Sequence, residues 1–253
     1  MNTAATLSEP RFRLKIVPLL VAAALGYGVP YGAGWLAYLC SRFLHTPSPT
    51  GPLVQWLYMQ HGFQLLLALA VIAVLKYRFV PADYGLHLPR GKTYVWAALF
   101  WGIFFGVLMT VVDYAPQLIA HTLPDLGYRP TRANVWGWTL FEGIYVGPTE
   151  EIPFRALIVT YLAATMPGKL RIGRYSMNWA GIIAAVIFAL LHANNFETRH
   201  WPQALGQQFY AFVLGVLYAY WLEKSGSILA SMVGHNVSDV VEQLIVFGWC
   251  GAL

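Results

Sequence analysis

The sequence predicts an all-α fold: a polytopic transmembrane helical bundle of about seven to eight spans, with a polar site between the later helices. Composition supports this prediction, because 58% of the 253 residues are hydrophobic and only 11% are charged, with a mean hydropathy of +0.54. Soluble globular domains carry about 25% charged residues. Spans of ~20 residues with short loops fill the chain, so we expect residues 1–253 to form a single integral membrane domain.

Seven apolar segments account for the predicted spans. They are residues 16–41, 63–75, 94–120, 135–165, 177–191, 204–222 and 228–247. The first contains Pro30 and several glycines, which predicts either one kinked helix or two shorter pieces. The fourth is long for a ~30 Å hydrocarbon core and contains Pro148 and Pro153, so we expect a bend or an interfacial start.

The basic residues predict how the bundle is oriented. With seven spans, eleven of the sixteen Lys and Arg residues fall in loops on the N-terminal side, and four fall in loops on the other side. The first group is Arg11, Arg13, Lys15, Lys76, Arg78, Arg90, Lys92, Lys169, Arg171, Arg174 and Lys224, and the second is Arg42, Arg129, Arg132 and Arg199. Loops rich in Lys and Arg stay in the cytoplasm, so we predict a cytoplasmic N-terminus. The same pattern of short clusters argues against nucleic-acid binding despite a net charge of +5.

Ionisable residues within the spans are candidates for a functional site, because burying charge in a bilayer is costly. They are Asp113, Glu142, Glu150, Glu151, Arg155, His192, His235, Asp239 and Glu242. Glu151 and Arg155 are one helical turn apart and can neutralise each other. Glu150 points about 100° away without a local cation, which makes it the predicted proton acceptor. Pro153 cannot donate to the carbonyl of Thr149, so we expect that carbonyl to be free for water or a peptide.

Two later helices carry the remaining candidates. His192 ends an apolar helix four residues after Phe188, so both side chains lie on one face. His235, Asp239 and Glu242 form a polar stripe at i, i+4 and i+7 on an otherwise apolar helix. A carboxylate one turn from a histidine can fix its tautomer for catalysis or for a metal.

Carboxylates and histidines on three spans indicate water activation and hydrolysis inside the membrane. A proton-coupled transporter would place similar residues at mid-membrane. Transporters of that kind are often built from inverted repeats, and the sequence shows none.

Three motifs in this order resemble the CPBP family, the CAAX-protease and bacteriocin-processing group of intramembrane endopeptidases, also called the Abi family. The family pattern is Glu-Glu-x-x-x-Arg, then Phe-x-x-x-His, then His-x-x-x-Asn or Asp, each on its own helix. The matching residues are Glu150, Glu151 and Arg155, then Phe188 and His192, then His235 and Asp239. The resemblance covers roughly residues 135–247, which we expect to hold the catalytic motif helices.

The resemblance implies a glutamate-dependent protease of about eight spans with a conical cavity open to water. Glu150 would activate water, assisted by His192. Glu151 and Arg155 would brace the site, with Phe188 as part of the motif. His235 and the residue at position 239 would polarise the scissile carbonyl and stabilise its oxyanion.

Asp239 departs from the family pattern, because many members carry Asn there. An Asn amide can donate a hydrogen bond to an oxyanion, whereas an ionised Asp repels it. Asp239 is therefore either protonated or a group that orients His235. Two histidines and two carboxylates, Glu150, His192, His235 and Asp239, also allow a zinc site. Members of the family have been described both as metalloproteases and as metal-free glutamic proteases, and we expect a metal-free site.

The resulting functional hypothesis is an intramembrane endopeptidase that cleaves near the C-terminus of a membrane-anchored or lipidated protein or peptide. We expect it in the bilayer of a bacterial cytoplasmic membrane, with no nucleic-acid partner. The competing hypotheses are a non-catalytic scaffold or immunity protein of the same family, in which the polar cluster only holds helices together, and the proton-coupled transporter. The sequence does not predict the oligomeric state.

Overall fold

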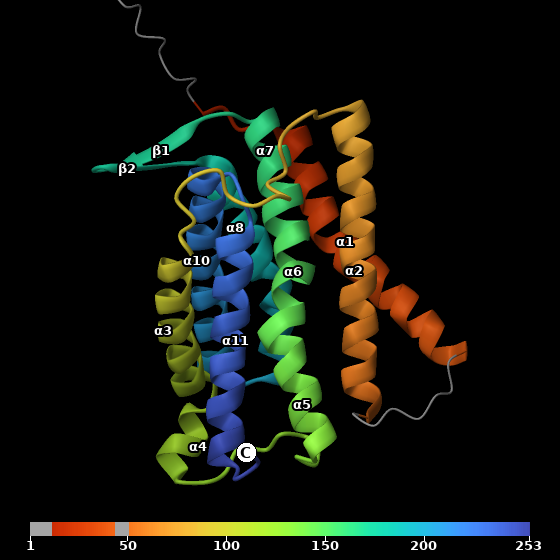
Figure 1. Cartoon of the computed structure of the whole chain (residues 1–253), viewed down its shortest axis with the longest axis vertical. Coiled ribbons are helices and arrows are strands. Elements are labelled where there is room, and N and C mark those ends of the chain that lie inside the picture. Colours follow the sequence, from red (N-terminus) through yellow and green to blue (C-terminus); the bar gives the residue numbers. More distant parts are fainter. Residues whose placement is uncertain (1–11, 44–50) are drawn as a thin grey trace, which may run out of the picture.

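Long helices, most of them running between the same two ends, make up the architecture (Figure 1). The computed structural model describes residues 12–43 and 51–253. The helices are α1 (Ile16–Phe43), α2 (Gly51–Arg78), α3 (Val95–Asp113), α4 (Ala115–Ala120), α5 (Arg132–Leu140), α6 (Val146–Glu151), α7 (Thr160–Thr165), α8 (Trp179–Leu191), α9 (Asn195–Thr198), α10 (Trp201–Ser225) and α11 (Leu229–Trp249). Two π-helical stretches, η1 (Phe141–Tyr145) and η2 (Ile152–Val159), and a 3₁₀ turn, η3 (His192–Asn194), complete them. The predicted all-α class is confirmed.

Four helical segments are long and apolar enough to cross a membrane, namely Ile16–Phe43, Leu53–Arg78, Val95–Asp113 and Trp179–Thr198. The chain therefore has the character of a membrane protein. The predicted count of seven to eight spans is not confirmed. Of the other long segments, α5 to α7 are divided by π-helical stretches, α10 carries three glutamines near its start, and α11 carries polar side chains in its middle.

Large exposed apolar side chains cover the outside of the bundle. Trp96 and Tyr77 are each 82% exposed near one end, and Trp136 and Trp201 are 65% and 69% exposed near the other. Tryptophan and tyrosine gather at both interfaces of a bilayer, where their rings are half in lipid and half in water. Their positions place the long axis of the bundle across the membrane.

The first predicted span is a single helix. Proline at position 30 lies inside α1, which continues on both sides of it. On the face that meets α8, a Cβ atom at Gly26 would come within 2.5 Å of Ile187. Glycine therefore lets α1 approach α8 closely, and the broken sequence of α1 reflects helix packing.

The fourth predicted span is one helical column from α5 to α7 (Figure 1). The prolines in this segment predicted a bend, and the helix is distorted there by two π-helical stretches, one on each side of α6. Stretches of this kind are frequent at functional sites, because they redirect the side chains that follow them. In this chain they flank the segment that carries both glutamates of the first motif.

The prediction that the Thr149 carbonyl is free for water or a peptide is wrong. The carbonyl accepts a hydrogen bond of 2.8 Å from Nε2 of Gln64 on α2. Pro148 likewise cannot bond the carbonyl of Ile144, and that oxygen accepts from Nδ2 of Asn236 on α11 at 3.3 Å. Two neighbouring helices therefore supply the donors that the prolines lack, which satisfies the buried backbone.

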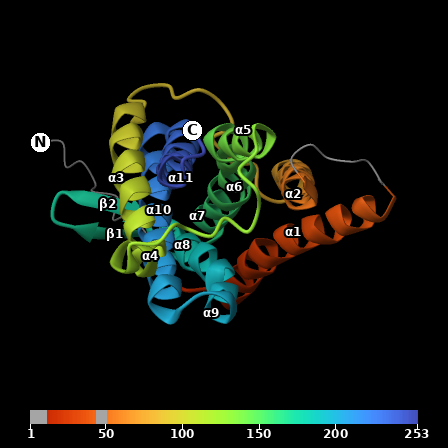
Figure 2. The same cartoon turned by 90° about the horizontal axis from the view of Figure 1, so that it is seen from below.

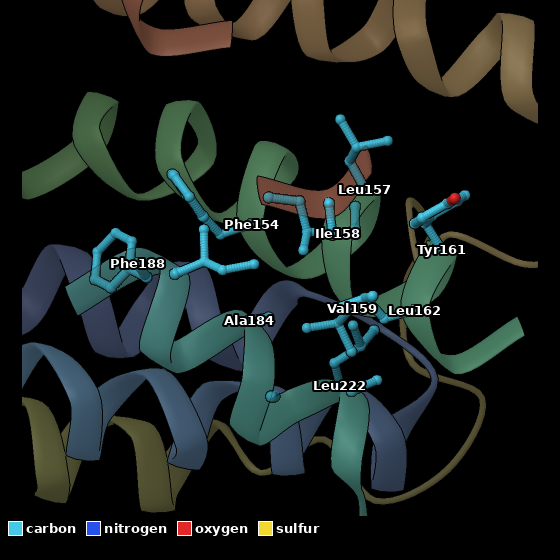
Figure 3. Close-up of a cluster of buried hydrophobic side chains, with 14 of the residues drawn as sticks. Phe154, Leu157, Ile158, Val159, Tyr161, Leu162, Ala184, Phe188 and Leu222 are labelled. Carbon is cyan, nitrogen blue, oxygen red and sulfur yellow. The ribbon is translucent and has the colours of Figure 1, made fainter. Parts of the chain in front are cut away.

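The apolar core lies between η2, α7 and α8 (Figure 3). Leu157, Ile158 and Leu162 are fully buried there, and Phe154 and Phe188 close the cluster on the side of the polar residues. Phe188 packs edge-to-face on Phe154 at 4.9 Å between ring centroids. The apolar core therefore ends at Phe188, which is one of the predicted site residues.

A short antiparallel hairpin was not predicted. Strand β1 (Lys169–Ile172) pairs with β2 (Tyr175–Asn178), and Gly173 takes the positive φ of 57° that the tight turn requires. Each strand is only four residues long, and the hairpin carries several charged residues. Its sequence therefore resembles that of a loop.

Candidate active site

A cavity of about 550 Å³ brings the predicted site residues together. Glu150 from α6, Phe188 from α8, His192 from η3, and His235 and Asp239 from α11 all line it. Residues nearly 90 positions apart in the sequence thus meet at one place in the bundle.

Glu151 and Arg155 form a buried ion pair behind the cavity wall. Nη1 of Arg155 lies 2.9 Å from Oε1 of Glu151, and the two side chains are 2% and 0% exposed. The guanidinium also lies 4.5 Å from the ring centre of Phe188 and 5.1 Å from that of Tyr218. Ring faces attract a cation, so they stabilise the charge where water cannot reach it. The predicted pairing of these two residues is present in the structure.

Glu151 also fixes the orientation of His235. The Nδ1 atom of His235 lies 2.7 Å from Oε1 of Glu151. The opposite nitrogen, Nε2, then faces the cavity, 3.7 Å from Oε2 of Glu150 and 3.4 Å from Oδ2 of Asp239. Asp239 therefore contacts the edge of the His235 ring opposite to the one that Glu151 binds.

The ion pairs of Glu150 recorded among the described residues are both with imidazoles. Besides His235, Nε2 of His61 lies 4.0 Å from its Oε1, and its side chain is 20% exposed. No lysine or arginine ion pair holds this carboxylate in the part of the chain that the structure describes. It can therefore accept a proton without first breaking an ion pair with lysine or arginine.

The hydrogen bonds of His192 define its tautomer. Nδ1 lies 3.0 Å from the carbonyl oxygen of Phe188, which can only accept, so Nδ1 carries the hydrogen. The lone pair of a neutral His192 is then on Nε2. The structure records no direct bond from His192 to Glu150 among the described residues, yet both line the same cavity. A cavity of about 550 Å³ is large enough to hold water.

His61 was missed by the sequence analysis. Its Nδ1 lies 2.9 Å from Oγ1 of Thr149, whose own hydroxyl bonds backbone carbonyls, so His61 donates and leaves Nε2 toward Glu150. The predicted second span began at residue 63, two positions too late to include this histidine. The helix begins at Gly51, and a histidine within an apolar helix was the available signal.

Two other acidic candidates, Glu142 and Glu242, line the same cavity. Asp113 lines it as well and is paired with Arg199, and Tyr210 donates to the same carboxylate at 2.9 Å. This pairing ties the segment after α9 to α3. It gives Asp113 a structural partner, in contrast to Glu150.

The four candidate zinc ligands, Glu150, His192, His235 and Asp239, line the same cavity. Among the described residues, no three His, Cys, Asp or Glu side chains are grouped closely enough to hold an ion. His192 directs its Nδ1 hydrogen to a carbonyl, and Nδ1 of His235 is bonded to Glu151, so both rings leave Nε2 toward the cavity.

A second cavity of about 480 Å³ reaches Glu150 from the side of the bundle. It lies between α1 and α2, and its outer wall includes the exposed rings of Tyr31 and Trp35. His61 and His192 line both cavities together with Glu150. Glu150 is therefore reachable from a polar cavity and from an aromatic groove.

Residues 132–241 match the family model described as Type II CAAX prenyl endopeptidase Rce1-like. We call these residues, which are similar to that family, the Rce1-like segment. The predicted resemblance to the CAAX-protease family is thereby confirmed, on a segment that spans less than half of the 253 residues. No curated protein and no solved structure matches the chain. His61 and Gln64 lie outside the Rce1-like segment, so α2 completes a site whose motifs come from that segment.

Proposed function

We propose that this protein is an intramembrane endopeptidase in which Glu150 activates water to hydrolyse a peptide bond. One observation carries the proposal: Glu150 lies in a cavity with His192 and His235, while the neighbouring Glu151 is neutralised by Arg155. The Rce1-like match supports a peptidase of the CAAX prenyl endopeptidase type. Glutamate as the general base is our own assignment.

In the proposed reaction a water molecule sits between Glu150 and His192. Glu150 takes one proton from it while the oxygen attacks the carbonyl carbon of the scissile bond. The negative charge then develops on the carbonyl oxygen, and a protonated His235 stabilises it from Nε2. The proton held by Glu150 passes to the amide nitrogen, and the C–N bond breaks to give a carboxylic acid and an amine.

Asp239 takes part through His235 in this scheme. Its Oδ2 is 3.4 Å from Nε2 of His235, and Glu151 is bonded to Nδ1, so two carboxylates favour the imidazolium. An imidazolium can donate to an oxyanion, which an ionised Asp cannot do. This explains how Asp is compatible with the role that the resemblance gives to position 239.

The proposed substrate is a membrane-anchored or lipidated protein or peptide that is cleaved near its C-terminus. The aromatic groove between α1 and α2 supports this, because an apolar anchor can lie against its rings while the bond reaches Glu150. We propose that the enzyme works without a metal, in a bacterial cytoplasmic membrane, with its N-terminus in the cytoplasm.

Two synthetic peptides test the proposal in bilayer discs. One is a farnesylated peptide ending in Cys-aliphatic-aliphatic-X, and the other is an apolar helix with a hydrophilic flank, each with a quenched fluorophore pair. We expect the wild-type protein to cleave at least one of them and Glu150→Gln to cleave neither. Equal cleavage by wild type and Glu150→Gln would exclude Glu150 as the base.

A further inference from the structure

The cavity that holds Glu150 opens at one end of the bundle. Its wall includes Asp125 and Leu126 from the loop before α5, Leu53 at the start of α2, and Tyr114 after α3. Asp125 and Leu53 are exposed. These residues lie at the end where α4, α5 and the C-terminus are found, which is the lower end in Figure 1. We call this the mouth end.

The described residues that line the cavity do not come from the opposite end of the bundle. Among the described residues, the cavity has no lining residue from the 79–94 loop, from the β1–β2 hairpin or from the turn between α10 and α11. Those three connections lie together at the upper end of the bundle in Figure 1. Water and peptide therefore have their route to the polar cavity from the mouth end.

Basic residues are concentrated away from the mouth. The described ones at the opposite end are Arg13, Lys15, Lys76, Arg78, Arg90, Lys92, Lys169, Arg171, Arg174 and Lys224. The described mouth end carries Arg42, Arg129, Arg132 and Arg199, and the last of these is paired with Asp113. The view from below in Figure 2 shows α4, α5, α9 and the C-terminus around this end.

Short connections rich in Lys and Arg are retained in the cytoplasm. The fold brings the three basic connections to one end, although they are far apart in the sequence. That end is therefore cytoplasmic, and the mouth end faces the other side of the membrane.

We infer that the active site is served from the non-cytoplasmic side, so its substrate is the anchor region of an exported protein. The inference rests on the proposed peptidase function. The hydrophilic part of such a substrate enters at the mouth, and its apolar anchor lies in the groove between α1 and α2. Among the described residues, no cavity gives a prenylated protein on the cytoplasmic face a polar route to Glu150 from its own side.

Thiol labelling tests the orientation without any substrate. In a background with Cys40→Ser and Cys250→Ser, single cysteines are placed by Asp125→Cys at the mouth, Leu126→Cys in the cavity wall and Arg174→Cys on the hairpin. Spheroplasts are treated with a membrane-impermeant maleimide before or after permeabilisation. Helix content and elution from size-exclusion chromatography check that each variant folds.

We expect Asp125→Cys and Leu126→Cys to react in intact spheroplasts, and Arg174→Cys to react only after permeabilisation. Reaction of Arg174→Cys in intact spheroplasts overturns the inference, whether the mouth residues react or not. Failure of Leu126→Cys to react even after permeabilisation also overturns it, because the cavity would then be closed to water.

The labelling outcome is independent of catalysis. If the orientation is as inferred but Glu150→Gln cleaves peptides as well as wild type, the proposed chemistry fails and the access side stands. If Arg174→Cys reacts from outside while Glu150→Gln is inactive, the peptidase assignment stands and the substrate is cytoplasmic.

Discussion

At the scale of single residues, the site depends on how two adjacent glutamates differ. Glu151 is bonded to Arg155 and His235 and has no exposed surface, whereas Glu150 faces the cavity with imidazoles nearby. Helix geometry separates them, because successive side chains point about 100° apart. The same chemical group is therefore a structural ion in one position and a candidate base in the next.

Replacing Glu150 by Gln should abolish peptidase activity and leave the protein folded. Gln has the same shape but cannot accept the proton of water, and a general base typically contributes about 10²–10⁴-fold to a rate. The measurement is cleavage of the fluorogenic peptides, with thermal unfolding in bilayer discs as the check on folding. Glu197→Gln on the exposed α9 is the matched control and should keep wild-type activity.

Replacing Arg155 by Met should unfold the protein more readily. The change leaves the fully buried carboxylate of Glu151 without its cation, and breaking a buried ion pair from one side costs about 3–5 kcal/mol. The free energy of unfolding should fall by that order in denaturant titration. The double variant Glu151→Gln with Arg155→Met should recover part of the loss, and an unchanged loss in the double variant would contradict this account.

The site residues that the sequence predicted can be recognised within one short segment. The residue and the contact that it missed depend on how the helices pack. Glu150, Glu151 and Arg155 stand out within one segment, because charge in an apolar run is anomalous wherever the helix goes. His61 has no such neighbourhood, and only the packing of α2 against α6 brings it to within 4.0 Å of Glu150. The contact of Glu151 with His235 likewise depends on tertiary structure.

At the scale of elements, the segment from α5 to α7 is held by amide side chains from its neighbours. Gln64 and Asn236 bind the two carbonyls that Pro153 and Pro148 leave without helical donors. Gly147 allows the approach, because a Cβ atom there would lie 2.5 Å from Oδ1 of Asn236. The backbone around Glu150 is therefore fixed by contacts that adjoin His61 and His235.

Gln64→Leu should lower the free energy of unfolding by about 1–3 kcal/mol, because a buried carbonyl loses its only added donor. Pro153→Ala restores a backbone N–H at that turn, so the loss should be smaller when both changes are combined. A double-mutant cycle in denaturant measures this coupling. Gln208→Leu on α10 is the control, because Nε2 of Gln208 is buried without a partner in the described structure and its removal should cost little.

The 79–94 loop should loosen as pH rises. Nε2 of His87 lies 2.9 Å from Asp83, and Nδ1 lies 2.8 Å from the Leu88 carbonyl. The hydrogen bond to the Leu88 carbonyl is the largest cause that raises the pKa of His87, and the hydrogen bond to Asp83 is the next. The hydrogen bond from His87 in turn lowers the pKa of Asp83. The contribution of His87 is complete below its ordinary pKa of about 6.5 and is lost as pH rises through the raised value. The contribution of Asp83 is lost only in acid.

Hydrogen exchange at the amide of Gly85 measures this, because that N–H donates to Asp83 at 3.0 Å. After correction for intrinsic rates, protection should be higher at pH 5.5 than at pH 9. His87→Gln should remove the difference. Persistence of the same pH dependence in His87→Gln would assign it to another group.

Sequence periodicity located the helices better than their ends. Every predicted span contains a helix, but the second begins at Gly51, twelve residues before its expected start, and the hairpin was expected to be a loop. The apolar pattern there is interrupted by Gln55, Gln60 and His61. The segment is nevertheless helical, and α2 packs against α6. The donors to the carbonyls of Thr149 and Ile144 come from α2 and α11, so no local sequence pattern contains them.

At the scale of the whole molecule, the long helical segments form a bundle whose described chain starts and ends at opposite ends (Figure 1). If α5 to α7, α10 and α11 cross the membrane together with the four apolar segments, the number of crossings is odd. The two termini then lie on different sides.

Reporter fusions test this arrangement. A fluorescent protein that matures in the cytoplasm should be bright at the N-terminus and dark at the C-terminus, and alkaline phosphatase should be active only at the C-terminus. Matching results at both termini would show an even number of crossings. That result would contradict the arrangement without bearing on the chemistry at Glu150.

The aromatic groove between α1 and α2 affects how the purified protein should be handled. A surfactant monomer has an alkyl tail of the kind that the rings of Tyr31 and Trp35 can cover, and the groove leads to Glu150. Micelles would thus supply a competitor at millimolar concentration. Turnover should decline as surfactant chains lengthen and should recover after transfer into lipid discs.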